Sequence, residues 1–477
     1  MSKPIRFLSA SLAAMTLALP ALAAEESVAL NRIEADRAAN IETANAIWKL
    51  AEVGYQETQS SKLLQDRLST EGFEVEAGVA GAPTAFTATY STGDGPTIGI
   101  MGEFDALPGF SQAAQPEKQA VPGTDAGHAC GHHLFGTASA SAAIAVKDWL
   151  VSTGTPGTVR FYGTPAEEGG AGKVYMVREG LFDDVDVALH WHAGSENSAD
   201  IATSNSNKSG KFRFHGKSAH AAAAPEQGRS ALDGVEAMDM MANMMREHLP
   251  QESRMHYVIT AGGRAPNVVP DYAEVFYYVR NPDAEVVRET FDRLVKVAEG
   301  AAMGTGTTMD YEVIHGAMPL LPNQTLQTLV HQKMTEVGGI DYDAEETAFA
   351  ETISPTLAEP APISEAGQID PLSEDHGAGS TDVGDVSWAV PTAGFRTATW
   401  VPGTPAHSWQ AVAAGGMSIG WKGMQNAAKI LALTAIDLYE QPALIEQARS
   451  EWEGRKPDGF EYRALLGDRD PPLDYRN

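Results

Sequence analysis

The sequence predicts an α/β protein with a mostly parallel central sheet and a smaller α+β unit inserted into it. Short apolar strands alternate with helical patterns over much of the chain, which is typical of a parallel sheet covered by helices. Residues 207–317 break this alternation and follow the order β-α-β-β-α-β. The length of 477 residues also exceeds the roughly 250–300 residues over which a single core usually extends.

Four predicted segments of the central sheet end in polar side chains. The segments are 97–105 (TIGIMGEFD), 158–168 (TVRFYGTPAEE), 185–192 (VDVALHWH) and the strand and loop 392–407 (TAGFRTATWVPGTPAH). The polar residues at their ends are Glu103, Asp105, Glu167, Glu168, His190, His192 and His407. Because ligands of parallel α/β sheets gather outside the carboxyl ends of the strands, we expect these side chains to share one site.

Helical patterns at 135–150 and 417–439 supply covering helices for the sheet. The inserted unit is expected to contain strand 208–216, helix 228–249, strands 256–263 and 272–281, helix 284–302 and strand 307–316. The methionines of 238–245 indicate core packing or a helix–helix interface rather than an adaptable binding surface. The acidic, proline-containing residues 340–380 are predicted to form a long loop near the site, or a disordered excursion.

The N-terminus has the pattern of a signal peptide. Lys3 and Arg6 precede an apolar run from about Phe7 to Leu19, and Ala21-Leu22-Ala23 forms a small-residue cleavage motif. The alternative is a membrane anchor, but the run is shorter than the ~20 apolar residues that a span needs. We therefore expect residues 1–23 to be removed and the mature protein to be soluble and periplasmic.

The formal net charge of −29 argues against nucleic acid and anionic membrane surfaces as partners. Solubility is the simplest explanation for this charge. A local cationic pocket is still compatible with an anionic substrate.

The only cysteine, Cys130, lies in the sequence GHACGHH. It has no second cysteine with which to form an internal disulfide. A lone thiol is most often a buried, inert side chain. Here, however, His128, His132 and His133 place imidazoles beside it, and sulfur and imidazole are both ligands of zinc and related metals. This short motif does not complete a site, so the remaining ligands are expected at the strand ends.

Each strand-end residue also has an ordinary structural explanation. A Glu-Glu pair is usually a solvated patch, but Glu167 and Glu168 follow an apolar strand and precede two glycines, which favours a site. Asp105 can cap a turn, and His407 can be a satisfied loop histidine. Capping is the favoured explanation for Asp382 in GSTDVGD.

Seven motifs together resemble those of the aminoacylase and carboxypeptidase metallohydrolases, most closely the amidohydrolase branch with a cysteine ligand. In chain order they are GEFDALPG, GHACGHH, TPAEEGG, ALHWHAG, GKSAHAAAAPEQGRSALDG, PNVVPDYAEV and GTPAHSWQ. The resemblance covers about residues 40–440. No single motif is specific, but the ordered set is.

The resemblance implies a centre of two divalent metal ions, zinc or manganese. The implied ligands are Cys130, His132, Glu168, His192 and His407, with Cys130 bridging and His192 preferred to His190. Glu167 matches the general base, which takes a proton from metal-activated water and passes it to the leaving amine. Asp105 matches the aspartate that orients a ligand. Glu103 stands where other branches have a histidine ligand, so its role is open.

The resemblance also gives the inserted unit the role of a lid and dimerisation domain. His220 matches a histidine that stabilises the oxyanion, often from the opposite subunit of a dimer. Asn267 and Arg280 match the pair that holds the substrate carboxylate, which an arginine can bind through two hydrogen bonds. The alternatives are a surface turn for His220 and a structural salt bridge for Arg280.

These inferences together predict a periplasmic amidohydrolase. Its substrate would be an N-acyl or N-aroyl amino acid such as aminobenzoyl-glutamate. A dipeptidase or general deacylase is the nearest alternative, and a non-catalytic binding protein is disfavoured by Glu167. A homodimer, or pairing with a related second subunit, is expected. The expected boundaries are signal peptide 1–23, catalytic parts 24–206 and 318–440, lid 207–317 and a C-terminal extension 441–477 without a predicted role.

Overall fold

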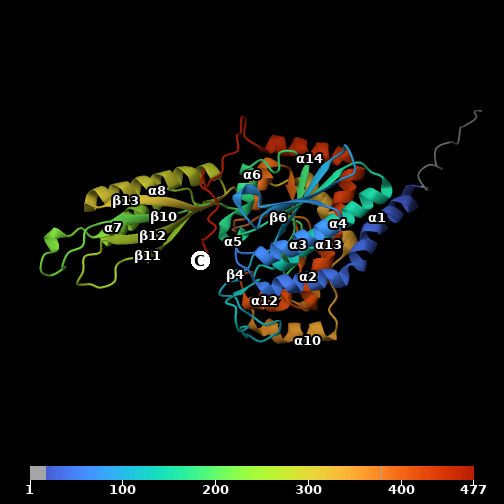
Figure 1. The fold of residues 1–477 in the computed structure, drawn as a ribbon, viewed down its shortest axis with the longest axis horizontal. Coiled ribbons are helices and arrows are strands. Elements are labelled where there is room, and N and C mark those ends of the chain that lie inside the picture. The colour runs from blue at the N-terminus through green and yellow to red at the C-terminus, as the bar shows by residue number, and fades with distance from the viewer. Residues whose placement is uncertain (1–17, 378, 477) are drawn as a thin grey trace, which may run out of the picture.

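The computed structural model describes residues 18–377 and 379–476. It consists of a large main unit and an elongated inserted unit that projects from its side (Figure 1). The first 17 residues of the predicted signal peptide lie outside the described residues, and helix α1 (Ala18–Ala35) follows them. Among the helices that the structure describes, none combines the length and the apolar character of a membrane span.

The main unit is built on a six-stranded sheet with the order β1-β2-β6-β3-β7-β15. The strands are β1 (Glu74–Ala77), β2 (Phe86–Ser91), β3 (Thr97–Glu103), β6 (Thr158–Thr164), β7 (Val187–Leu189) and β15 (Thr392–Ala393). β6, β3, β7 and β15 are mutually parallel, whereas β2 runs antiparallel to both β1 and β6. The prediction of a mostly parallel sheet is confirmed.

Helices cover both faces of this sheet. On one face, Ile98 and Ile100 belong to the core that includes the buried helix α4 (His132–Thr153), which α1 and α13 (Ser418–Glu440) contact in turn. On the other face, Met101 and Tyr162 belong to a core with α6 (Gly172–Arg178) and α11 (Val383–Ala389). Apolar side chains therefore alternate between two buried faces, as expected for strands between two helical layers.

Shorter elements complete the main unit. The other helices are α2 (Arg37–Leu50), α3 (Thr58–Thr70), α5 (Glu167–Gly170), α9 (Gln324–Val337), α10 (Ala344–Ile353), α12 (Trp409–Gly415) and α14 (Pro442–Arg455). Three two-stranded pairs are β4 (Leu107–Pro108) with β5 (Ala126–Gly127), β8 (His192–Gly194) with β16 (Arg396–Ala398), and β9 (Ile201–Thr203) with β14 (Glu374–His376).

The inserted unit has the predicted order β-α-β-β-α-β. Its elements are β10 (Ser206–His215), α7 (Ala231–Arg246), β11 (Arg254–Ala261), β12 (Tyr272–Asn281), α8 (Ala284–Thr305) and β13 (Thr308–Ala317). The sheet order is β11-β12-β10-β13, and α7 and α8 pack on it around a core of their own. Asn207 pairs with Ala317, so the chain enters and leaves this unit at the same end.

The prediction of a loop or disordered excursion over 340–380 is wrong in part. Helix α10 occupies residues 344–353 and begins with a capping box, in which Asp343 and Glu346 each accept a hydrogen bond from the other's backbone N–H. Strand β14 then pairs with β9 beside the pocket described below. The acidic composition of the segment obscured a helix start that the Asp-x-x-Glu spacing indicates.

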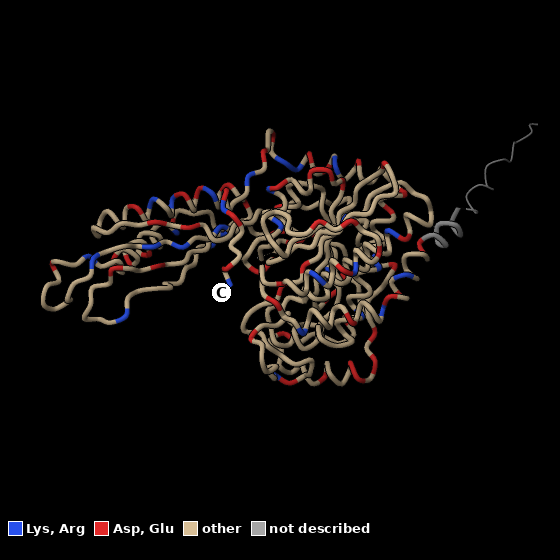
Figure 2. The backbone as a smooth tube through the Cα atoms, in the orientation of Figure 1, with Lys and Arg blue, Asp and Glu red and all other residues tan. Residues whose placement is uncertain are grey.

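The last described residues cross between the two units. After α14, residues 457–476, called the strap here, run over the inserted unit and end beside α5 (Figure 1). Acidic side chains are spread over both units and interspersed with basic ones (Figure 2). The net charge of −29 is therefore not confined to one segment.

Candidate metal centre

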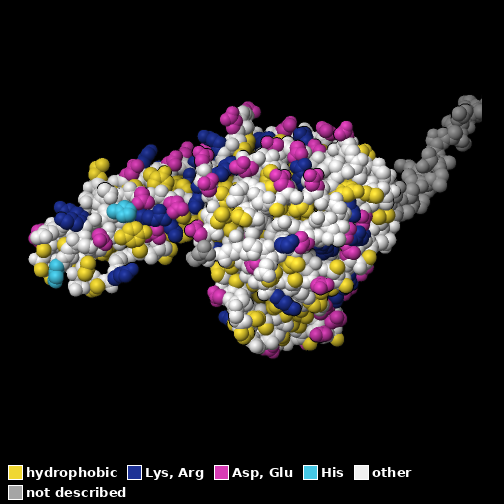
Figure 3. Space-filling view, viewed as in Figure 1, with side chains coloured by type: hydrophobic (Ala, Val, Ile, Leu, Met, Phe, Trp, Pro, Cys, Tyr) yellow, Lys and Arg dark blue, Asp and Glu magenta, His cyan; other side chains and the backbone are white. Residues whose placement is uncertain are grey.

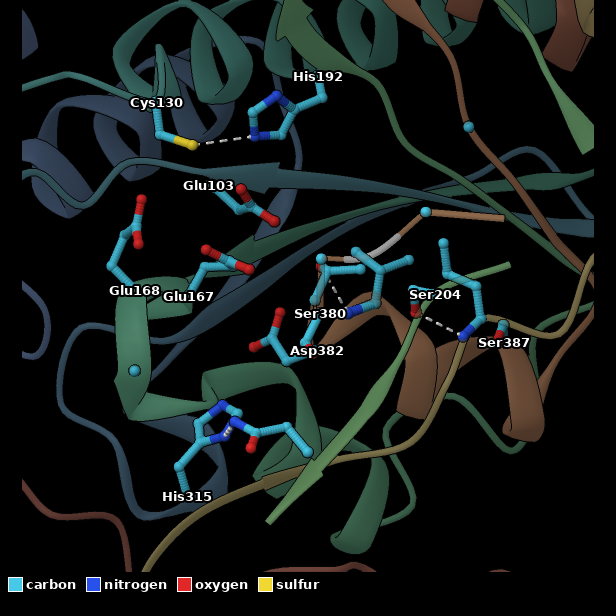
Figure 4. A pocket seen from close by; sticks show the side chains of 18 of the residues that line it. Glu103, Cys130, Glu167, Glu168, His192, Ser204, His315, Ser380, Asp382 and Ser387 are labelled. Carbon is cyan, nitrogen blue, oxygen red and sulfur yellow. Dashed lines mark hydrogen bonds between the residues drawn. The ribbon is translucent and has the colours of Figure 1, made fainter. Parts of the chain in front are cut away.

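The predicted site residues of the main unit converge at the carboxyl edge of the sheet. All of them except the fully buried Asp105 and His132 line a cavity of about 1160 Å³, to which both units contribute walls. The sulfur of Cys130 and the ring of His192 face each other there, and the carboxyl groups of Glu103, Glu167 and Glu168 lie close by (Figure 4).

One group of metal donors consists of Cys130, His132 and His192. One donor atom from each lies within 4.8 Å of the other two. The Cys130 sulfur is 3.4 Å from His192 Nε2. The geometry thus selects His192 over His190, whose ring instead packs against Gly394 so closely that a Cβ there would overlap it.

A second group consists of Cys130, Glu168 and His407, again with one donor atom from each within 4.8 Å of the others. His407 Nε2 lies 2.9 Å from Glu168 Oε1. Cys130 belongs to both groups, which is the position that a bridging sulfur requires. The five residues predicted as ligands are therefore brought together as two sets of three that share one atom.

The hydrogen bonds around His132 fit a metal ligand. Its Nδ1 lies 2.9 Å from Asp105 Oδ1, while its Nε2 is buried and makes no hydrogen bond of good geometry among the described residues, although Glu103 Oε2 lies 3.0 Å away. A histidine ligand is usually held in this way, through the ring nitrogen that does not bind the metal. The other Asp105 oxygen accepts a hydrogen bond of 3.0 Å from the backbone N–H of Glu168. Asp105 thus orients one residue from each donor group.

The donor set also suits divalent cations chemically. One sulfur, three imidazoles and a carboxylate are ligands that zinc and manganese accept in proteins. Glu103 Oε2 is a further buried oxygen without a hydrogen-bond partner among the described residues, 3.0 Å from His132 Nε2. Burial raises the pKa of the Cys130 thiol, so a cation would be needed to keep the sulfur ionised.

Glu167 lies beside these two donor groups without belonging to either. It forms a third group of possible metal donors with Glu103 and His132, in which one donor atom of each residue lies within 4.8 Å of the other two. Burial raises the pKa of Glu167 well above its usual range, and the neighbouring Glu103 and Glu168 carboxylates raise it further. A carboxyl group in this state is suited to hold a proton and release it.

The loop that carries Glu167 and Glu168 has a strained backbone. Ala166 and Ala171 adopt φ values of 56° and 59°, in the left-handed region that is unfavourable for residues with a Cβ. His407, which faces this loop from another segment, also lies in that region, with a φ of 56°. Side chains hold the loop in place. Glu57 Oε1 accepts a hydrogen bond of 2.8 Å from Ala166 N, and the Tyr55 hydroxyl donates one of 2.8 Å to Gly170 O. Such strain persists only where surrounding contacts fix the backbone.

Sequence reasoning missed Lys173. Its ammonium group is fully buried and lies 2.6 Å from Glu103 Oε1 and 2.7 Å from Asp382 Oδ1. Burial alone would raise the pKa of Glu103, but Lys173 and His132 outweigh it and the net pKa is lowered. The capping explanation favoured for Asp382 is wrong for α11, where its side chain makes no cap hydrogen bond. Instead, its carboxylate accepts hydrogen bonds from the Lys173 ammonium group and from the Lys173 backbone N–H in the first turn of α6.

The other two histidines of GHACGHH have structural roles. His128 Nε2 lies 3.1 Å from Ile47 O, and His133 Nε2 lies 3.0 Å from Gly415 O. Both rings are buried, and burial lowers the pKa of His128 to about 3. They are neutral core side chains that fix the start of α4.

The predicted substrate-binding residues of the inserted unit separate into two places. Arg280 lines the cavity with Asn207 and His315, and its Nε is buried without a hydrogen-bond partner among the described residues. The Arg280 guanidinium lies over the Tyr278 ring, 5.5 Å from its centroid, and forms no salt bridge among the described residues, so the structural alternative is not observed. His220 and Asn267 are exposed and adjacent, with Ala221 N donating to Asn267 O, and they do not line this cavity. Their roles stay predictions, and for His220 the resemblance places that role in the opposite subunit of a dimer.

Comparisons with known proteins agree with this geometry. A family model described as a peptidase dimerisation domain matches residues 203–305. A subunit of the p-aminobenzoyl-glutamate hydrolase of Escherichia coli (strain K12) is 41% identical over 453 residues, covering 88% of this chain and 93% of that protein. The Xaa-Arg dipeptidase of Mus musculus is 30% identical over 432 residues, covering 86% of this chain and 88% of that protein.

A solved structure gives the same fold. The Bacillus subtilis protein described as a dinuclear metal binding peptidase from the M20 family has a TM-score of 0.57 at 19% identity, covering 85% of this chain and 99% of that one. Fold, donor groups and relatives together define a metal-dependent hydrolase of amide bonds. The chain belongs to the M20 family, the aminoacylase and carboxypeptidase metallohydrolases that its motifs resemble.

Proposed function

We propose that this protein hydrolyses the amide bond of an N-aroyl or N-acyl amino acid, with p-aminobenzoyl-glutamate as the first candidate. The observation that carries the proposal is the pair of donor groups sharing Cys130, with the Glu167 carboxyl group beside them. The name of the 41% identical relative supports the aroyl group and the glutamate.

The residues of the chain divide the chemistry between them. Two bound divalent cations, for which zinc and manganese are the candidates, would supply Lewis-acid activation of water and of the amide carbonyl. Glu167 accepts the proton of the attacking water and donates it to the leaving amine, a transfer that its raised pKa favours. Arg280, whose Nε has no hydrogen-bond partner among the described residues, holds the carboxylate of the amino-acid product from the cavity wall.

The proposed active form is a homodimer. Apolar side chains are exposed on α7 and β11 of the inserted unit, and Figure 3 shows yellow side chains among charged ones on this unit. The exposed apolar residues of these two elements, called the patch here, are Met240, Met241, Met244, Tyr257, Val258 and Ile259. β11 is an edge strand, so its outer backbone groups are free to pair with another chain. His220 does not line the cavity of its own chain, so its predicted oxyanion role is assigned to the second copy. Pairing with a related but different chain is the alternative, since the 41% identical relative is named as one subunit of its hydrolase.

Export to the periplasm is the proposed localisation. Among the α1 residues whose side chains are described, 26–35, the core members Ala29 and Ile33 follow the cleavage motif at Ala21–Ala23. Removal of residues 1–23 would therefore leave these two core residues in place.

The test is hydrolysis of a panel of amides by protein loaded with zinc or manganese. The panel contains p-aminobenzoyl-glutamate, an N-acetyl amino acid and an Xaa-Arg dipeptide, with products detected by mass. We expect the wild type to release glutamate from the first compound, and Glu167→Gln to bind the same metals but lose at least about 100-fold in kcat. Preferential cleavage of the dipeptide would support the activity named for the 30% identical relative instead.

A further inference from the structure

The strap connects the two units along its whole length. Tyr462 donates a hydrogen bond of 2.7 Å to Asp385 in α11, and Leu465 is fully buried in the core of the inserted unit. Arg469 binds the β13 carbonyl oxygens of Val313 and Ile314. In the main unit, Arg178 donates to two strap carbonyl groups at 2.9 and 2.8 Å. The strap is thus fixed to a strand of the inserted unit and to helices of the main unit.

The end of the strap reaches the candidate metal centre. The Tyr475 hydroxyl donates a hydrogen bond of 3.1 Å to the backbone carbonyl of Glu168, and Arg476 Nη2 donates to the same oxygen. The Tyr475 ring packs edge-on against Tyr55, which holds Gly170 of the same loop. Gly54 allows this approach, because a Cβ there would lie 2.1 Å from the Tyr475 hydroxyl.

We propose that Tyr475 and Arg476 are positioning residues for one of the two cations, the one held by Cys130, Glu168 and His407. They fix the carbonyl of Glu168 from outside the loop, while Asp105 fixes its N–H from inside. With both backbone groups held, the strained loop has one orientation in which the Glu168 carboxylate faces Cys130. This inference rests on the proposed two-cation centre.

The contacts predict a selective effect. The other donor group, Cys130, His132 and His192, receives no hydrogen bond from the strap among the described residues. Its histidines are held by Asp105 and by the Ala193 carbonyl. Loss of the strap contacts should therefore weaken the binding of one cation and leave the binding of the other unchanged.

Electrostatics and positioning make opposite predictions for Arg476. Its positive charge lies near the centre, and removal of a positive charge would by itself strengthen the binding of a cation. Weaker binding after Arg476→Ala is thus evidence for positioning. Arg476→Lys keeps the charge but not the planar fork of donors, so it separates the two effects.

The experiment measures zinc and cobalt per chain by equilibrium dialysis, and cobalt spectra report the ligands of each cation. The variants are Tyr475→Phe, Arg476→Ala, Arg476→Lys and the double variant Tyr475→Phe/Arg476→Ala. Tyr90→Phe is the matched control, because it removes a tyrosine hydroxyl from β2 for which no hydrogen bond is described. Thermal unfolding of each variant checks that the fold is intact.

We expect the double variant to bind the cation at Cys130, His132 and His192 as the wild type does. The cation that Glu168 and His407 would hold should bind about 10- to 100-fold more weakly. Tyr475→Phe alone should show a smaller loss of the same cation, and the control none. This inference alone is overturned if the wild type binds two cations and the double variant binds both with unchanged affinity, or both with equally reduced affinity. Fewer than two cations on the wild type would overturn the proposed centre as well.

Discussion

Replacement of Lys173 by methionine is the most direct test of the charge balance beneath the metal centre. Methionine is similar to lysine in length and volume, so the change removes the charge and leaves the space filled. In the wild type, Lys173 lies between Glu103 and Asp382, at 2.6 and 2.7 Å, and all three side chains are excluded from solvent. The variant leaves two buried carboxylates without their cation.

Removal of one partner from a buried ion pair typically costs about 3–5 kcal/mol. The whole of this range applies here: Lys173 serves two carboxylates, which increases the loss, whereas its backbone N–H still donates to Asp382 at 2.9 Å in the variant, which limits it. Protonation limits the loss, since Glu103 and Asp382 can take up protons once the ammonium group is gone. At roughly 2 °C per kcal/mol for a unit of this size, the expected fall in Tm is about 6–10 °C.

The assay compares urea and thermal unfolding of the wild type, Lys173→Met, Asp382→Asn and the double variant. Lys62→Met is the matched control, because Lys62 forms a salt bridge of the same length, 2.7 Å to Asp66, with both side chains exposed. The control should lose less than about 1 kcal/mol. The double variant should recover part of the loss, since one uncompensated carboxylate is removed. If the free energy of unfolding of Lys173→Met is within about 1 kcal/mol of the wild-type value, the ion triad does not stabilise the fold as its burial implies.

Three further predictions follow from other contacts. Cys130→Ser should weaken both cations by at least about tenfold in equilibrium dialysis, because the sulfur belongs to both donor groups; loss of only one would refute the shared position. Burial raises the pKa of Asp385 to about 7, so wild-type stability should fall as the pH rises from about 4 to 7, where the unfolded chain has already released this proton. In urea unfolding at pH 4.5 and 7.5, Asp385→Asn should lose less of its free energy of unfolding over this interval than the wild type does, by up to about 4 kcal/mol. An equal loss in the two proteins would contradict the raised pKa of Asp385. Val258→Asp on the exposed edge strand should convert a dimer to monomers in size-exclusion chromatography, whereas Val151→Asp, at an exposed valine of α4 in the main unit, should not.

The ligands could be predicted from sequence because each one follows a local signal. Glu168 comes directly after an apolar strand, and Cys130 lies within three residues of the histidines that precede a long apolar helix. Parallel strands bring their carboxyl ends to one edge, so sequence order alone implies convergence. The same reasoning made the order of the inserted unit predictable, since its strands and helices have clear periodicity.

Residues whose role depends on distant partners could not be predicted. Lys173 contacts Asp382 across 209 positions, and Tyr475 contacts Glu168 across 307, with no local pattern that marks either pair. From the sequence, Asp382 is interpreted as a cap because it directly precedes a helix, whereas its lysine partner lies 209 positions away. His220 is a different case, since its predicted task depends on a second molecule rather than on contacts within the chain.

The position of the inserted unit has a consequence for the order of assembly during synthesis. The central sheet is incomplete until β15 joins β7, and these strands lie on opposite sides of the insertion. The inserted unit has its own core and is made before β15 emerges, so it can form first. Once formed, it places Asn207 next to Ala317 and turns a separation of about a hundred residues into a short link, which lowers the entropic barrier to joining the two halves. Slow formation of this unit would therefore delay every later step, including the arrival of His407.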